Sequence, residues 1–210
     1  MTHDRVVQEA SIASARTNPA ATAEVPAPTG WIYEHTADNS ARFVLGTVGA
    51  NPLVCFGVNP STATPNNLDT TLRRIRGYAA RNEHDSWVML NLYPQRSTDP
   101  AGMHLVYLPA LKAENERHIA ELVDGRKLTL VAAWGEPITT RGYLHQMLED
   151  IVSITASSSC DWKSIGGLTA KRHPRHPSRG VYLPLQRFDM DEYLEPIRPK
   201  PIDATATMMA

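Results

Sequence analysis

Apolar residues in this chain gather in three short, continuous runs, each of which ends at a polar turn. Leu53–Val58, Trp87–Leu92 and Leu128–Ala133 are rich in aliphatic and β-branched side chains. Runs of this length without polar alternation are typical of strands that are buried on both faces. The pattern therefore predicts three buried strands at the centre of a sheet.

Shorter segments predict further strands around this centre. Trp31–His35 and Arg42–Leu45 indicate an antiparallel pair at one edge of the sheet. A short strand is expected around Ser164–Leu168, and a last strand or helix around Tyr182–Tyr193.

Apolar residues three and four positions apart predict helices between the strands. These segments are Thr70–Asn82, Leu111–Leu122 and Arg141–Ile151, and Asp69 is a suitable N-cap for the first of them. Strands that alternate with helices predict an α/β fold, with a mostly parallel sheet covered by helices on both faces. Ligands of such sheets bind beyond the carboxyl ends of the strands.

Length and composition predict one domain. The chain has 210 residues, of which 42% are hydrophobic, enough for one substantial core. We expect the domain to span residues 29–194. Residues 1–28, rich in Ala, Thr and Pro, and residues 195–210 are expected to be disordered tails.

The formal net charge of −1 gives no globally basic surface, so binding to nucleic acid would require a local patch. Arg73, Arg74, Arg76 and Arg81 on one predicted helix, with the cations of residues 171–179, could form such a patch. A helix face that is merely solvated is the alternative.

Several kinds of site lack the residues they require. Cys55 and Cys160 are too few for a disulfide framework and have no metal spacing, and Cys55 is most simply a small buried hydrophobe. The histidines have no metal-ligand spacing and no glycine-rich phosphate loop occurs, so we expect no metal and no cofactor. Signal-peptide and membrane-spanning stretches are also missing, which favours a soluble protein of the cytoplasm.

Four polar loops follow predicted strands and are therefore expected at one edge of the sheet. The first contains Asn59, locked by Pro60, and then Ser61 and Thr62. The hydroxyls and backbone amides of this loop could bind an anion. A turn that only closes the strand is the alternative.

The second loop begins at Asn91, which is polar within an otherwise apolar strand. Burying an amide costs free energy unless it is paired. Asn91 is therefore either a structural hydrogen-bonding group or a group that reads a base. Tyr93 follows it, and Arg96 and Asp99 could pair with each other as a purely structural contact.

The third and fourth loops add aromatic, acidic and cationic groups. Trp134 and Glu136 bring an indole face and a carboxylate to the third loop, although Trp134 could equally be a core residue. The fourth is the tract 173–180, His-Pro-Arg-His-Pro-Ser-Arg-Gly, in which each proline holds the preceding histidine in extended backbone. Rigid histidines among cations suit an anionic ligand or a developing negative charge. An exposed basic loop is the alternative.

Five segments in this order carry a resemblance to a known family: Asn59-Pro-Ser-Thr-Ala63, Asp69-Thr-Thr-Leu-Arg-Arg74, Asn91-Leu-Tyr-Pro-Gln-Arg-Ser-Thr-Asp-Pro100, Ala133-Trp-Gly135 and Pro174-Arg-His-Pro177. Through them the chain resembles a bacterial and phage family known as domain of unknown function 1643, over roughly residues 31–185. That family label implies no activity.

A more distant resemblance does imply one. Gly57-Val-Asn-Pro60, Met89-Leu-Asn91, Trp134-Gly135 and His176-Pro-Ser178 are similar, in the same order, to short segments of the uracil-DNA glycosylase superfamily. This resemblance implies a three-layer α/β/α sandwich with a short, mostly parallel central sheet. It also implies hydrolysis of the N-glycosidic bond of a base flipped out of DNA.

The resemblance assigns roles to individual residues. Asn59 would position a water against the sugar carbon, and His176 would donate a hydrogen bond to the departing base. Asn91 would read the edge of the base, with Tyr93 or Trp134 stacking on it. Phosphate contacts are expected from a set of polar and cationic residues: Arg96, His173, Arg175, Ser178 and Arg179. Within this set, His173 is either a scaffold residue or a phosphate contact.

One departure from the superfamily bears on the chemistry. Asn59 stands where the most active members carry a carboxylate, and an amide cannot act as a general base. Some mismatch-type members also carry asparagine there. Asp69, Asp99 and Glu136 are the candidates for a replacement acid.

Three functions follow from these observations. The first is a DNA N-glycosylase for a modified or mismatched base, with DNA as its partner. The second is a non-catalytic module that binds nucleic acid or nucleotides. The third is an N-glycosidase for free nucleosides or nucleotides. The catalytic hypotheses require Asn59 and His176 to face each other across one cleft.

Overall fold

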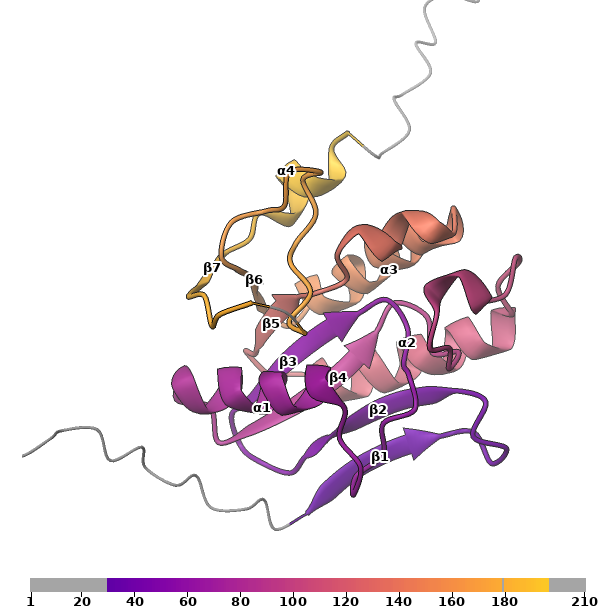
Figure 1. The fold of residues 1–210 in the computed structure, drawn as a ribbon, viewed down its shortest axis with the longest axis horizontal. Helices are drawn as coiled ribbons and strands as arrows, with labels where there is room; N and C mark the ends of the chain where they lie inside the picture. The colour runs from indigo at the N-terminus through magenta and orange to yellow at the C-terminus, as the bar shows by residue number, and fades with distance from the viewer. Residues whose placement is uncertain (1–29, 179, 197–210) are drawn as a thin grey trace, which may run out of the picture.

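One seven-stranded sheet forms the centre of the protein, whose computed structural model describes residues 30–178 and 180–196 (Figure 1). The strand order is β1-β2-β4-β3-β5-β6-β7. The strands are β1 (Trp31–His35), β2 (Arg42–Thr47), β3 (Pro52–Gly57), β4 (Ser86–Asn91), β5 (Thr129–Ala132), β6 (Asp161–Ile165) and β7 (Leu185–Arg187). The helices are α1 (Thr70–Arg81), α2 (Pro109–Val123), α3 (Tyr143–Ala156) and α4 (Met190–Leu194), with short 3-10 turns η1 (Pro100–Gly102) and η2 (Glu136–Thr140).

The sheet is mixed, which corrects the expectation of a mostly parallel one. β4, β3, β5 and β6 pair in parallel, whereas β1–β2, β2–β4 and β6–β7 are antiparallel. The physical reason lies in the connections, because a parallel pair needs a long crossover and an antiparallel pair does not. Helices α1, α2 and α3 provide crossovers between β3 and β6 only. The α/β class is confirmed, and the parallel order is limited to four of the seven strands.

Alternate residues of the central strands face two separate cores. Val54 and Phe56 of β3 belong to a cluster with residues of α2, α3 and α4, whereas Leu53 and Cys55 belong to a cluster with residues of α1. This is the period-two alternation of a strand. Helices therefore cover both faces of the sheet, with α1 on one and α2 and α3 on the other (Figure 1).

Most predicted segments are confirmed, with boundaries that shift by a few residues. β1 has the predicted bounds, and the side chain of Asp69 accepts a hydrogen bond from the backbone N–H of Leu72 (2.9 Å) as the N-cap of α1. Cys55 is buried, and its burial raises the pKa of the thiol. The final segment contains both a strand, β7, and a helix, α4. The expected tails fall outside the described residues, except for 195 and 196.

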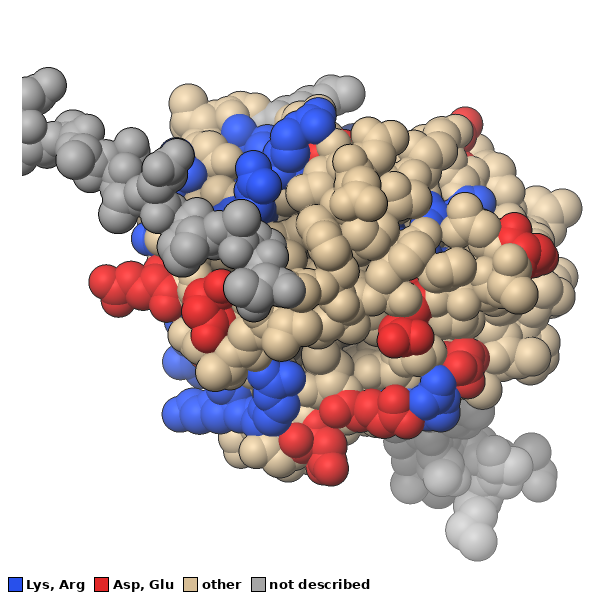
Figure 2. All heavy atoms as spheres, turned by 90° about the horizontal axis from the view of Figure 1, so that it is seen from below, with Lys and Arg blue, Asp and Glu red and all other residues tan. Residues whose placement is uncertain are grey.

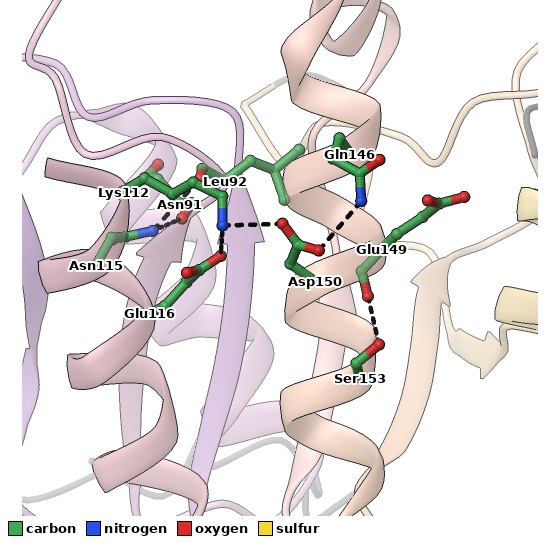
Figure 3. A network of polar contacts seen from close by, with 9 residues as sticks. All are labelled: Asn91, Leu92, Lys112, Asn115, Glu116, Gln146, Glu149, Asp150 and Ser153. Atoms are coloured by element: carbon green, nitrogen blue, oxygen red, sulfur yellow. Dashed lines mark hydrogen bonds and ion pairs between the residues drawn. The ribbon is translucent and has the colours of Figure 1, made fainter. Parts of the chain in front are cut away.

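Polar contacts from the middle of α2 fix the carboxyl end of β4 (Figure 3). Asn115, which is buried, donates from Nδ2 to the carbonyl oxygens of Asn91 (3.0 Å) and Leu92 (3.4 Å). Lys112, one turn earlier, forms ion pairs with Glu116 and with Asp150 of α3 (2.9 Å to Asp150). These contacts hold two helices against the strand end from which a polar loop departs. No helix in the described ranges is both long and apolar enough to span a membrane.

We predict that Asn115→Ala destabilises the fold by about 1–3 kcal/mol, because buried carbonyls at the end of β4 lose their donor. Chemical denaturation measures the change in unfolding free energy. Gln146→Ala is the matched control, since this exposed amide donates to Asp150 in the same network and its removal should cost less than about 0.5 kcal/mol. Equal effects of the two substitutions would contradict the structural role given to Asn115.

Candidate functional site

A cleft of about 510 Å³ lies at the carboxyl ends of β3 and β5. Its walls are the loop after β3, the first turn of α1, the loop after β4 and the segment after β5. Five of the residues predicted from the sequence line it: Asn59, Ser61, Asp69, Trp134 and His176. The structure therefore brings parts of all four polar loops together, along with the N-cap of α1.

The amide of Asn59 holds two of these loops together. Its Nδ2 donates to the carbonyl oxygens of Ser97 (2.9 Å) and Pro60 (3.2 Å), which ties the loop after β3 to the loop after β4. Its Oδ1 receives no hydrogen bond from a described residue. The donor side of Asn59 is thus structural, and its acceptor side remains available to a molecule in the cleft.

Two prolines and a helix hold His176. Pro174 and Pro177 are buried on either side of it, whereas the imidazole is exposed. Its Nδ1 lies 2.8 Å from the hydroxyl oxygen of Ser178, whose backbone N–H also points at Nδ1 (3.4 Å). In the neutral imidazole an acceptor at Nδ1 leaves the proton on Nε2.

Arginines of α1 anchor this same tract. The Nε of Arg74 donates to the carbonyl oxygen of Pro177, and its Nη2 donates to that of Val181 (3.3 Å). The guanidinium carbons of Arg74 and Arg81 also lie 4.3 and 3.8 Å from the ring centre of Tyr182. The expected basic patch on this helix is therefore partly used inside the protein. Arg73, Arg76 and Arg81 of the predicted helix set are exposed, whereas Arg74 is half-buried.

Of the three carboxylates considered, Asp69 lines the cleft. Its carboxylate is oriented by the cap hydrogen bond to α1. Asp99 is exposed and accepts a hydrogen bond from the backbone N–H of Ala101 (2.9 Å), and Glu136 forms an exposed ion pair with Lys171. Asp69 is thus the carboxylate best placed to act on a ligand beside Asn59.

Neither aromatic residue considered for stacking presents an exposed ring. Trp134 and Tyr93 both have 0% exposed surface, so Trp134 forms a wall of the cleft from within the core. The indole Nε1 of Trp134 donates to the hydroxyl of Tyr193 (3.1 Å), which in turn contacts Nδ1 of His173 (2.9 Å). The Tyr93 hydroxyl contacts Nδ1 of His104 (2.8 Å). Stacking of a base on either ring would need a rearrangement.

The His173 ring belongs to this aromatic group rather than to the cleft. It lines a second, smaller cavity of about 370 Å³ together with Tyr193 and Phe188. Burial lowers the pKa of its imidazole, Lys171 lowers it further and Glu136 partly opposes the shift. Of the two roles considered, scaffold or phosphate contact, these contacts favour the scaffold.

Asn91 is fully buried directly beside the cleft floor. Neither its Oδ1 nor its Nδ2 has a hydrogen-bond partner among the described residues. It follows Met89 on the α1 face of β4, and a Cβ added to Gly57 would lie 3.0 Å from its Oδ1. Gly57 and Met89 line the cleft. The unpaired amide of Asn91 therefore lies directly behind Gly57 and Met89 of the cleft lining, and the absence of a Cβ at Gly57 leaves room for it.

None of the described residues predicted to bind phosphate lines the cleft, and each has contacts elsewhere in the protein. Arg96 donates to the carbonyl oxygens of Ser61 and Ala63 and to the hydroxyl of Tyr33. Arg175 donates to the carbonyl oxygen of Gly167 (3.0 Å). Ser178 contacts His176, Thr62 is exposed without lining the cleft, and Arg179 lies outside the described residues. No three His, Cys, Asp or Glu side chains in the described ranges cluster as a metal site requires.

Sequence reasoning missed Arg42, which lines the cleft although it is only 2% exposed. It begins β2, and because β2 is antiparallel to β4 its first residue lies at the edge where β4 ends. The backbone N–H of Arg42 donates to the carbonyl oxygen of Pro94, just beyond β4 (2.9 Å). A charged residue at the start of a predicted strand was the available signal. Thr70, Thr71 and Ser97 add hydroxyls to the same lining.

Comparison with known proteins identifies the family. A family model described as "Protein of unknown function (DUF1643)" matches residues 42–178, a stretch that includes every residue of the cleft described above. No curated protein and no solved structure matches the chain. The match covers well over half of the sequence and confirms the first resemblance. The chain belongs to the DUF1643 family.

Proposed function

We propose that this protein hydrolyses the N-glycosidic bond between a sugar and a modified or mismatched base. The distant resemblance to the uracil-DNA glycosylase superfamily suggests the reaction. The observation that carries the proposal is that Asn59 and His176, to which that resemblance gives the two central roles, line one cleft together with Asp69.

The reaction requires a water to attack the sugar carbon while the bond to the base breaks. The Oδ1 of Asn59 accepts a hydrogen bond from this water and orients it, but an amide cannot take its proton. The carboxylate of Asp69 takes that proton. The electron pair of the broken bond goes to the base nitrogen.

His176 stabilises the leaving group. Its Nε2–H donates to the base as negative charge develops there, and a donor fixed in advance is effective because it needs no reorganisation. Pro174, Pro177 and the anchoring by Arg74 supply that fixed position. Arg74 is therefore a positioning residue in this scheme.

Asn91 provides the recognition of the base. Asn91 is fully buried beside Gly57 and Met89 of the cleft floor, so a base edge reaches it only if these floor residues move. The base would then offer a donor and an acceptor to an amide that lacks both. A buried polar group left unpaired by a wrong ligand penalises that ligand strongly, which is an efficient source of specificity. Selectivity is thus expected from hydrogen bonding rather than from aromatic stacking.

DNA is the first proposed substrate, and a free nucleotide is the second candidate. Figure 2 shows Lys and Arg in separate groups on one face, with Asp and Glu among them rather than one continuous basic surface. Arg74 and Arg81 are occupied by the 177–182 segment. The face drawn in Figure 2 therefore gives no extended contact for a duplex, since duplex binding depends on many phosphate contacts. DNA stays first because the distant resemblance implies it. A non-catalytic module that binds either ligand is a further alternative.

We predict that Asp69→Asn lowers the rate of base release by roughly 10²–10⁴-fold, the usual contribution of a general base. Asparagine is also a good N-cap, so the unfolding free energy should change by less than about 0.5 kcal/mol. The assay measures free base from DNA carrying diverse modified bases and from the matching nucleotides. Asp189→Asn, at the N-cap of α4, is the matched control and should leave the rate unchanged.

An unchanged rate in Asp69→Asn would remove the carboxylate from the mechanism. Wild-type protein that releases no base from either panel would refute the proposed reaction. Binding without release would favour the non-catalytic module.

We predict that His176→Ala lowers base release by about 10²–10³-fold while substrate binding changes little, because its hydrogen bond strengthens as the base departs. Single-turnover release and equilibrium binding separate the two effects. His35→Ala, an exposed histidine on β1, is the control. A loss of affinity equal to the loss of rate would assign His176 to ground-state binding instead.

A further inference from the structure

Arg42 is a buried cation that the proposed reaction does not use. A guanidinium group has five N–H donors. In Arg42, Nη1 donates to the carbonyl oxygen of Ala63 (3.1 Å), and the buried Nε has no partner among the described residues. Leaving such donors unpaired in a protein interior is costly, more so for a charged group than for a neutral one.

A second guanidinium group lies beside it. Arg96 donates to the same Ala63 carbonyl oxygen, from Nη1 at 3.3 Å and from Nη2 at 3.4 Å, and its Nε is also buried without a partner. Neither arginine belongs to an ion pair among the described residues. Two like charges therefore share one neutral acceptor.

The charge on this pair is only partly compensated. Burial lowers the pKa of Arg42 to about 10, repulsion from Arg96 contributes to the shift, and the carboxylate of Asp69 partly opposes it. A lowered arginine pKa means that the surroundings disfavour its positive charge. Asp69 opposes the shift of Arg42 but forms no ion pair with it, so the positive charge of Arg42 at the cleft lacks a close counter-ion among the described residues.

The rest of this wall also suits an anion. Thr70 and Thr71 begin the twelve-residue helix α1 and line the cleft, so the positive end of the helix dipole faces the same space. Ser61 adds a hydroxyl donor, whereas the hydroxyl of Ser97 donates to the carbonyl oxygen of Asp99 (2.5 Å). These groups would add to the binding of an anion by Arg42, the buried cation of this wall.

We propose that Arg42 binds the phosphate group of a nucleotide that enters this cleft. The phosphate oxygens accept hydrogen bonds from the guanidinium group and supply the negative charge that the Arg42–Arg96 pair lacks. A cleft of about 510 Å³ falls within the usual range for a single small ligand. The nucleoside part of the ligand rests on the proposed function, whereas the phosphate site does not.

Arg42→Met tests the site because methionine keeps an unbranched apolar stem and removes the charge. We expect the wild type to bind a nucleoside 5′-monophosphate at least 10-fold more tightly than the same nucleoside, by isothermal titration calorimetry. Arg42→Met should reduce this preference to about 2-fold or less. Its thermal midpoint should stay equal or rise, since removing a poorly compensated buried charge is often stabilising. Arg76→Met, an exposed arginine of α1, should keep the wild-type preference.

A second measurement needs no variant. Inorganic phosphate at about ten times its dissociation constant should raise the thermal midpoint of the wild type by roughly 3 °C over chloride at matched ionic strength. No rise, or an equal affinity of wild type for nucleotide and nucleoside, would overturn the site. If Arg42→Met keeps the wild-type preference for the monophosphate over the nucleoside, other residues bind the phosphate and the proposed role of Arg42 is wrong.

Further experiments distinguish a DNA phosphate from a free nucleotide, and the phosphate site from the proposed reaction. An oligonucleotide that competes with the monophosphate in wild type but not in Arg42→Met identifies a DNA phosphate as a ligand, and absence of competition identifies the free nucleotide. Phosphate-dependent binding without base release leaves the site intact and refutes the reaction. Base release that is insensitive to Arg42→Met refutes the site and leaves the reaction.

Discussion

The parallel pairing of β3 with both β4 and β5 is the constraint on which the candidate site depends. It brings the carboxyl ends of three strands to one edge, so loops distant in sequence meet there. Because α1 covers one face and α2 and α3 the other, the segments that leave these strands diverge, and a cleft remains between them. The amide of Asn59 and the guanidinium of Arg74 then secure the walls, the first by bonding to Ser97 and the second to Pro177.

The centre of the sheet was readable from the sequence because its signal is local. A strand formed by a continuous apolar run carries apolar side chains on both faces of the sheet, so both faces must be buried. The N-cap Asp69 is likewise recognised from the helical pattern that directly follows it. The orientation of the outer strands depends on whether a connection crosses over the sheet, which no single residue records. The antiparallel pairing of β1 with β2 was expected and is confirmed, whereas the pairing of β2 with β4 and the direction of β7 were not predicted. This gap had a consequence for the site, since the antiparallel β2 carries Arg42 to the edge where β4 ends.

Individual side chains were harder to predict for a related reason. The loops that follow strands bring Asn59 and His176 into one lining, and the N-cap of α1 brings Asp69 there. These positions do not specify which direction each group faces. Arg96 looked like a phosphate ligand, but three nearby acceptors take its donors. Tyr93 and Trp134 looked like stacking groups, and the core takes their rings. A pattern of residue types does not show that backbone carbonyls will take the donors of an arginine or that the core will bury an aromatic ring.

Among the described residues with unpaired buried polar atoms, Arg42 and Asn91 support the proposal of a ligand with two parts. Arg42 has a guanidinium nitrogen without a partner, Asn91 has two amide atoms without one, and both residues lie at the carboxyl end of β4. Leaving these atoms unpaired lowers the stability of the fold, so folding alone does not explain them. A molecule with an anionic group and a polar planar group would satisfy both kinds at once. A nucleotide has those two groups, joined by a sugar whose bond to the base would lie between them.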